Sequence, residues 1–237
     1  MTNQNIKPVC VIVGVGPGNG AAFAHHFASE GYRVALLARS TAFITELAAQ
    51  LDDAQAYSCD ITDAASVEIT FDTIRKALGK VDVLIYNPGV GVWGNVEEIT
   101  TEDFEASWRT NVLGALLTSK QVIPAMKQNQ QGSIIFIGAT ASRRGGARAV
   151  AFAAAKAAQK SLAESMARHL WPAGIHVGLV ILDGVVDTPA TRKMLPDKPD
   201  NYFIRPDDVA ENVMRLTQQP RSAWSFEVEA RPFGEIW

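Results

Sequence analysis

A cluster of glycines near the amino terminus has the spacing of a turn that binds phosphate groups. Directly after a short apolar run, the chain reads Gly14-Val15-Gly16-Pro17-Gly18-Asn19-Gly20. Glycine lets the backbone turn tightly and lets a pyrophosphate approach the main chain, and a following helix offers N–H groups and the positive end of its dipole. A simple loop would use the same residues, but the position between a buried strand and a helix favours a nucleotide site.

The end of the next apolar run indicates which nucleotide would bind. A carboxylate at this position accepts hydrogen bonds from the ribose 2′-hydroxyl of NAD. The chain has Ala38 there, followed by Arg39 and Ser40. Because an arginine can hold a 2′-phosphate through charge-assisted hydrogen bonds, we expect NADP(H) to be favoured over NAD(H). The alternative is that Arg39 is a solvated residue at a strand end.

A lysine stands in the middle of an alanine-rich segment, 147–171. Lys156 follows Ala153-Ala154-Ala155 and precedes two further alanines. Such a segment is expected to pack against the sheet and a partner subunit, where an ammonium is costly to bury without a ligand or a partner. We therefore expect Lys156 to bind a ligand, the alternative being a solvated position.

Short apolar runs alternate with longer segments of helical period along the whole chain. Strands that are apolar throughout, each followed by a helix, predict a parallel sheet covered on both faces, which is a doubly wound α/β fold. We expect this fold to form one domain over residues 1–237. The expected strands are 9–13, 33–38, 54–58, 81–86, 133–137, 175–181 and 224–228, and the expected helices are 21–29, 41–51, 63–78, 101–127, 147–171 and 206–216.

The composition argues against several classes of protein. A net charge of −3 and the lack of a basic stripe argue against nucleic acid as a partner. No apolar run reaches the roughly 20 residues that span a bilayer, and the polar first residues give no sign of a signal peptide. Cys10 and Cys59 fall in predicted strands without a local partner for zinc, so we expect buried thiols and no metal. We expect a soluble, cytoplasmic protein that acts on a small molecule without a membrane partner.

These motifs and several later ones resemble the short-chain dehydrogenase/reductase family, and the resemblance covers essentially the whole chain. The glycines match the family's G-x-x-x-G-x-G turn through Gly14, Gly18 and Gly20. The resemblance implies a three-layer, doubly wound Rossmann fold with a mostly parallel seven-stranded sheet. It also implies a homodimer or homotetramer, formed through the long helices 101–127 and 147–171. The residues that it assigns to the cofactor are Gly14, Gly18, Asn19, Gly20, Arg39, Ser40, Asp60, Ile61, Asn87, Gly89, Lys156, Gly184 and Thr188.

The catalytic motif departs from the family's pattern. The resemblance implies a tyrosine four residues before Lys156 that supplies a proton, but this position is Phe152, which has none to give. Ala139 stands at the usual serine position, and Thr140 and Ser142 beside it are either hydroxyl donors to a substrate or ordinary loop residues. The predicted catalytic residues are Lys156, Asn111, Thr140 and Ser142.

Three functions stay open at this point. The first is an NADP(H)-dependent reductase with another proton source, namely Thr140, Ser142 or a water ordered by Asn111 and Lys156. Alternatively, the chain binds the cofactor with little or no turnover, as a sensor or partner subunit, or it is a lyase or isomerase. We favour the reductase because the nucleotide motifs and Lys156 are retained.

The segment 189–205 has weak periodicity, and the resemblance makes it a short substrate lid. Its apolar residues, and Trp93 further back, either line a substrate pocket or complete the core. Arg143 and Arg144, two adjacent residues after the predicted strand 133–137, either bind an anionic substrate or are solvated loop residues.

Overall fold

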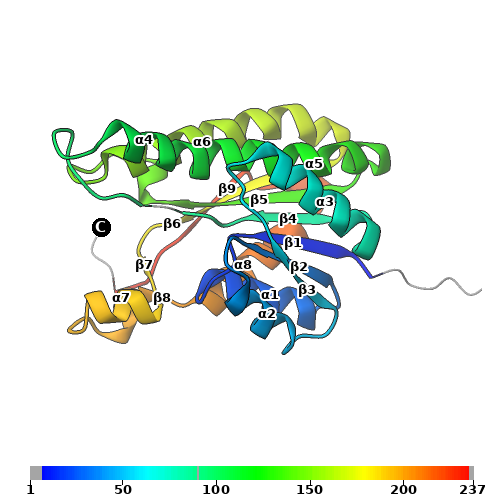
Figure 1. Ribbon diagram of the computed structural model, residues 1–237, viewed down its shortest axis with the longest axis horizontal. Coiled ribbons are helices and arrows are strands. Elements are labelled where there is room, and N and C mark those ends of the chain that lie inside the picture. The colour runs from blue at the N-terminus through cyan, green and yellow to red at the C-terminus, as the bar shows by residue number, and fades with distance from the viewer. Residues whose placement is uncertain (1–6, 90, 235–237) are drawn as a thin grey trace, which may run out of the picture.

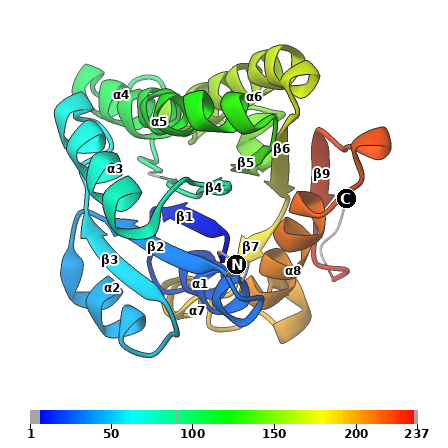
Figure 2. The same ribbon diagram turned by 90° about the vertical axis from the view of Figure 1, so that its right-hand side faces the viewer.

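A seven-stranded, fully parallel sheet forms the middle layer of the protein (Figures 1 and 2). The computed structural model describes residues 7–89 and 91–234, so most of the polar amino-terminal segment considered above lies outside it. The strand order is β3-β2-β1-β4-β5-β6-β9. The strands are β1 (Val9–Val13), β2 (Arg33–Ala38), β3 (Ala54–Ser58), β4 (Val83–Tyr86), β5 (Gly132–Ala139), β6 (Ile175–Leu182) and β9 (Glu227–Ala230).

Helices cover both faces of this sheet, which confirms the predicted three-layer, doubly wound fold (Figure 2). One face is covered by α1 (Asn19–Ser29), α2 (Thr41–Ala48) and α8 (Pro206–Thr217). The other is covered by α3 (Ala64–Leu78), α4 (Thr101–Trp108), α5 (Gly114–Asn129) and α6 (Val150–Leu170). Within the described residues, no helix combines the length and the hydropathy needed to cross a bilayer.

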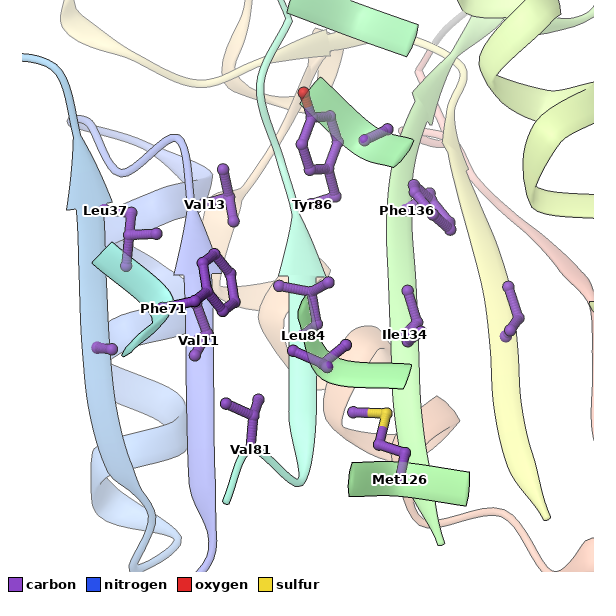
Figure 3. Packing of buried hydrophobic residues seen from close by; sticks show 14 of the residues in the cluster. Val11, Val13, Leu37, Phe71, Val81, Leu84, Tyr86, Met126, Ile134 and Phe136 are labelled. Carbon is purple, nitrogen blue, oxygen red and sulfur yellow. The ribbon is translucent and has the colours of Figure 1, made fainter. Parts of the chain in front are cut away.

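The apolar runs form strands because both of their faces are buried. Along β1, Val11 and Val13 pack into the core under α3, α5 and α6, whereas Cys10 and Ile12 pack into the core under α1, α2 and α8. Successive side chains of a strand point to opposite faces, so a continuous apolar run fills both cores. Figure 3 shows Val11 and Val13 facing the core that contains Phe71 of α3. Both cysteines are buried and free, as expected.

The predicted helix over 101–127 is interrupted. The structure has α4, then one π-helical turn (Arg109–Leu113), then α5. Tyr86, at the end of β4, donates a hydrogen bond from its buried hydroxyl to the carbonyl of Thr110 in this turn. A π-helical turn often marks a functional site, and here it turns Asn111 into the protein interior. The sequence periodicity does not reveal this one-residue change.

The closing strand lies at β9, three residues later than the predicted 224–228. Trp224 packs outside the strand: its ring stacks on His176 at a centroid distance of 4.8 Å, and its Nε1 donates to the carbonyl of Gln219. The strand therefore begins only at Glu227.

The segment 189–205 contains structure that its weak periodicity did not predict. It includes α7 (Pro189–Met194) and β8 (Phe203–Ile204), and β8 pairs in parallel with β7 (Val185–Val186). Thr188 caps α7 by accepting a hydrogen bond from the N–H of Thr191 at 3.1 Å. A side-chain cap of this kind can stabilise a short helix that lacks an apolar stripe.

Candidate functional site

Two cavities adjoin at the carboxyl ends of the strands. The first, of about 700 Å³, is bordered by the loops that follow β1, β2, β3 and β4. The second, of about 650 Å³, is bordered by the segments that follow β4, β5 and β6 and by α6. Gly89 borders both cavities. In a doubly wound sheet, ligands bind where the strand order reverses, which in this sheet is between β1 and β4.

The glycine turn after β1 packs closely against the loop after β4 and is hydrogen-bonded to it. Gly14 has a φ of +78°, and a Cβ built on it would lie 2.8 Å from Cγ and 2.9 Å from the backbone N of Pro88. The side chain of Asn87 donates from Nδ2 to the carbonyl of Gly14 at 2.8 Å. Gly14, Asn87 and Gly89, which the sequence assigned to one site, therefore lie together.

The start of α1 approaches two other segments closely. Gly18 has a φ of +114°, and a Cβ built on it would lie 2.8 Å from the methyl carbon of Thr188. A Cβ on Gly20 would lie 2.7 Å from the Cα of Val15. Glycine at these positions lets the helix begin directly at the site, where its first N–H groups can bind an anion.

Asn19, the first residue of α1, has an unsatisfied polar atom. Its Oδ1 is buried and has no hydrogen-bond partner within the described residues, and the side chain borders the second cavity. Buried polar atoms are nearly always paired, so this oxygen is available to accept a hydrogen bond from a ligand that enters the cavity. Together with the close approach of Gly18 and Thr188, it fits a dinucleotide that passes from one cavity to the other.

The first cavity has a cation at its edge. Arg39 and Ser40 both border it, and Arg39 is exposed. Ser40 is the residue directly before α2, but its side chain makes no capping hydrogen bond. Arg39 is therefore placed to meet a phosphate that enters this cavity.

Asp60 and Ile61 border the first cavity from the loop after β3. Oδ1 of Asp60 accepts hydrogen bonds from the backbone N of Thr62 at 2.9 Å and from its hydroxyl at 2.8 Å. These two hydrogen bonds, and then the charges of Arg39 and Arg109, lower the pKa of Asp60 below its usual value. The carboxylate is thereby held ionised and in one orientation, as an acceptor for a ligand's donor.

Lys156 is buried where the two cavities meet. Its side chain borders the second cavity, and a Cβ on Gly89 would lie 3.9 Å from its Nζ. Nζ donates to the carbonyl of Ile137 at 2.9 Å, to the carbonyl of Pro88 at 3.2 Å and to Oε1 of Gln159 at 3.2 Å. Burial lowers the pKa of Lys156 from 10.5 to about 7. The lysine is thus neither solvated nor unpartnered, and at neutral pH it can give or take a proton.

Gln159 is a site residue that the sequence analysis missed. It is fully buried, and its Nε2 donates to the main-chain carbonyl of Asn111 at 2.8 Å while its Oε1 accepts from Lys156. The side chain of Asn111 donates to the carbonyl of Ser107 at 2.9 Å and does not border either cavity. Asn111 is therefore linked to Lys156 through Gln159. The i, i+3 spacing of Lys156 and Gln159 on one helix was the only signal in the sequence.

The wall of the second cavity is aromatic at the position where the resemblance implies a tyrosine. Phe152 and Trp93 both border the cavity, and their ring centroids lie 5.5 Å apart at an interplanar angle of 49°. Nζ of Lys156 lies 5.9 Å from the centroid of the Phe152 ring. This wall offers apolar contact and no proton.

The two candidate hydroxyls lie in different environments. Thr140 borders the second cavity, and its hydroxyl donates to Oδ1 of the buried Asp183. Ser142 is buried, and its Oγ accepts a hydrogen bond from the backbone N of Ala139 at 3.2 Å. Of the two, Thr140 alone borders the cavity. Asp183 is a further residue whose contact the sequence did not reveal.

The remaining predicted residues divide between site and surface. Gly184 borders the second cavity, as does Thr191 of α7. Met194 is 73% exposed and borders neither cavity. Of the apolar residues expected at a substrate pocket, Trp93 borders the second cavity, whereas Met194, Leu195, Tyr202 and Phe203 do not.

The arrangement provides the parts of a dinucleotide-dependent site. The glycine turn after β1 leads directly into α1. The exposed Arg39 and the oriented carboxylate of Asp60 border the first cavity, and Lys156 borders the second. Residues 8–199 match the sequence profile of the family described as short chain dehydrogenase.

Individual relatives extend this similarity over nearly the whole chain. The human 3-oxoacyl-(acyl-carrier-protein) reductase is 30% identical over 218 residues, which cover 90% of this chain and 92% of that protein. A metagenomic short-chain oxidoreductase, solved in complex with NADP, has a TM-score of 0.83 at 28% identity and covers 95% of this chain and 97% of its own. The 3-ketoacyl-(acyl-carrier-protein) reductase of Brucella melitensis, solved with NADH, has a TM-score of 0.86 at 28% identity. The match covers 97% of this chain and 98% of that chain.

Proposed function

The chain belongs to the short-chain dehydrogenase family, and we propose that it is an NADP(H)-dependent oxidoreductase that interconverts a carbonyl compound and its alcohol without a tyrosine acid. The observation that carries the proposal is the position of Lys156. A buried ammonium with a pKa near neutrality borders the second cavity beside Gly89, the residue common to both cavities.

The cofactor would run from the first cavity to the second, past Gly89. The glycine turn and the start of α1 would hold its pyrophosphate, and Asp60 and Ile61 would hold its adenine end. Asn19, Gly184 and Thr188 would contact the part that reaches the second cavity. When bound there, the nicotinamide supplies or accepts the hydride.

The preference for NADP(H) rests on Arg39. Solved relatives contain either NADP or NADH, so they support a nicotinamide cofactor without choosing between the two. Arg39 borders the first cavity, and the residue before it is Ala38 rather than an acid. A guanidinium attracts a 2′-phosphate, whereas an acid at that position would repel it.

Lys156 is the proposed proton donor. In reduction, the carbonyl carbon gains the hydride and the oxygen gains a proton from the ammonium of Lys156. The ammonium exchanges its hydrogen bond to the carbonyl of Pro88 for one to the substrate oxygen and, after the transfer, is a neutral amine. A general acid works best when its pKa lies near the working pH, and burial brings the pKa of Lys156 to about 7. Gln159 positions the ammonium, and Asn111 holds Gln159 through its carbonyl.

Thr140 is the proposed partner of the alcohol. Its proton is engaged with the carboxylate of Asp183, a charged and therefore strong acceptor. The lone pairs of its Oγ1 remain to accept a hydrogen bond from the hydroxyl of the product alcohol, once Lys156 has passed its proton to the oxygen. Ser142 has no part in the proposal, because its Oγ is engaged with the backbone of Ala139.

The proposal includes a homodimer or homotetramer formed through α4, α5 and α6. Large apolar side chains are exposed along the first two helices, among them Phe104 at 40% and Trp108 at 45%. Small exposed alanines on α6, Ala154 and Ala157, would let another helix approach. A cytoplasmic location and a lid over 189–205 stay predictions.

The test is NADPH consumption by the wild type and by Phe152→Tyr on one panel of aldehydes, ketones and quinones. We expect the wild type to turn over members of the panel, with a rate that falls as pH rises through about 7, the pKa of Lys156. Phe233→Tyr is the matched control and should leave the rate unchanged, because Phe233 is 90% exposed and borders neither cavity. If only Phe152→Tyr is active, the wild type is instead a cofactor-binding protein with little or no catalysis.

A further inference from the structure

Two neighbouring arginines after β5 differ in what they contact. Arg143 donates to Glu227 of β9 through Nε at 3.0 Å and also forms an ion pair with Glu229. The side chain of Arg144 is 66% exposed and borders the second cavity. Arg143 therefore ties a loop to the sheet, whereas Arg144 lies at the cavity that we assign to the substrate.

The charge of Arg144 is not balanced by a close acidic partner within the described residues. Its one ion pair there is a long contact of 3.7 Å to Oδ1 of Asp183. That oxygen already accepts from Thr140, and the other carboxylate oxygen of Asp183 is paired with the guanidinium of Arg231. Arg231 also pairs with Glu229, and the carboxylates of β9, Glu227 and Glu229, pair with Arg143 and Lys160. Among the described residues this network has four cations for three carboxylates, so Arg144 keeps capacity for an anion.

The cavity as a whole favours negative charge. Among the described residues that border it, the ionisable side chains are Arg144, a permanent cation, and Lys156, and none is acidic. A cavity whose charges have one sign concentrates ligands of the opposite sign. Gly145 and Gly146 border the cavity beside Arg144, and a Cβ on Gly145 would meet nothing within 4 Å. The backbone next to Arg144 is therefore uncovered at Gly145.

An apolar wall completes the cavity. Trp93 is 64% exposed, and its ring lies beside that of Phe152. Leu182 and Val185 border the same cavity. A large exposed aromatic ring beside a cavity is typical of a surface that contacts a flat apolar ligand.

We propose that this cavity selects a substrate with a flat, apolar body and a carboxylate, with the body on Trp93 and Phe152 and the carboxylate on Arg144. The two oxygens of a planar carboxylate match the paired N–H groups of a single guanidinium. The proposal rests on the proposed function, because it concerns the same cavity. It assigns to Arg144 the role of determining substrate specificity.

The test uses naphthoate as the carboxylate probe and naphthylmethanol as its neutral counterpart, with binding measured by calorimetry with and without NADP⁺. We expect Arg144→Ala to weaken naphthoate binding about tenfold and to leave naphthylmethanol binding unchanged. Trp93→Ala should weaken both probes. Arg148→Ala is the matched control, because Arg148 is also 66% exposed but is paired with Glu98 and does not border the cavity.

Several outcomes would overturn the proposal. They are no binding of naphthoate to the wild type, equal binding by wild type and Arg144→Ala, and an equal loss for the charged and neutral probes. Tighter binding of naphthyl phosphate than of naphthoate, lost in Arg144→Ala, would replace the carboxylate by a phosphate.

Binding and turnover separate this proposal from the proposed function. Binding of naphthoate that depends on Arg144, together with no NADPH consumption on any carbonyl compound, would overturn the proposed function and support the role of Arg144. The opposite result is turnover of neutral carbonyl compounds, together with carboxylate-bearing ones that the wild type uses no better than Arg144→Ala does. It would support the proposed function and overturn the role of Arg144.

Discussion

The ammonium of Lys156 donates a hydrogen bond to the side-chain oxygen of Gln159, one turn further along α6, at 3.2 Å. The amide nitrogen of Gln159 donates in turn to the carbonyl of Asn111 at 2.8 Å. From the sequence, a water ordered by Asn111 and Lys156 was one of three alternative proton sources. In the structure the side chain of Gln159 links these two residues, so the position of the ammonium depends on a covalently held amide.

Replacing Gln159 by leucine tests this link. The change leaves the carbonyl of Asn111 without its donor and Lys156 with one acceptor fewer, in a fully buried place. We expect the free energy of unfolding to fall by about 1–3 kcal/mol. The measurement is urea denaturation of Gln159→Leu, Lys156→Met and the double variant. If the two single effects simply add, the two side chains are not coupled.

The pKa of Lys156 predicts how stability depends on pH. In the folded protein the lysine releases its proton at about pH 7, whereas its usual pKa is 10.5. Between these values the unfolded chain binds more protons than the folded one, so stability rises with pH. Below pH 7 both states are protonated and this contribution is constant.

Lys156→Met removes this contribution. We expect the free energy of unfolding of the wild type to rise relative to that of the variant as pH rises above 7, with a slope of up to about 1.4 kcal/mol per pH unit. Denaturation curves at several pH values measure this difference. Lys120→Met, at an exposed position of α5, is the control and should give curves parallel to those of the wild type. Parallel curves for Lys156→Met as well would mean that the buried lysine keeps its usual pKa.

Arg39→Ala tests the cofactor preference. Loss of a charge-assisted contact with the 2′-phosphate should raise the dissociation constant of NADPH roughly 10- to 100-fold and leave that of NADH unchanged. Cofactor fluorescence titrations measure both constants. Arg215→Ala, an exposed arginine paired with Glu211 on α8, is the control. An equal change for the two cofactors would place Arg39 away from the 2′-phosphate.

Gly14→Ala tests the packing of the glycine turn. A Cβ there would meet the ring and the backbone nitrogen of Pro88, in addition to the strain of a φ of +78°. Gly31→Ala is the matched control, because Gly31 has a φ of +83° with nothing within 4 Å of its built Cβ. We expect Gly14→Ala to lower the free energy of unfolding by at least about 1 kcal/mol more than Gly31→Ala. Equal thermal shifts for the two variants would show that Pro88 moves aside.

The amino-acid sequence by itself determined the layers of the fold and the outline of the nucleotide site. Apolar runs with helical segments between them can bury both faces of each strand only in a parallel sheet covered on both sides. The glycine turn after β1, the arginine after β2 and the phenylalanine four residues before Lys156 are local features, so they can be read along the chain.

Only the tertiary structure decided which side chains meet in the cavities. Thr140 and Ser142 are two residues apart, yet one borders a cavity and the other is buried against the backbone. Arg143 and Arg144 are adjacent, yet β9 supplies acidic partners only to the first at close range. The difference lies in contacts with segments more than 40 residues away, such as Asp183 and Glu227. Strand order and register set these contacts, and no pattern of neighbouring residues encodes them.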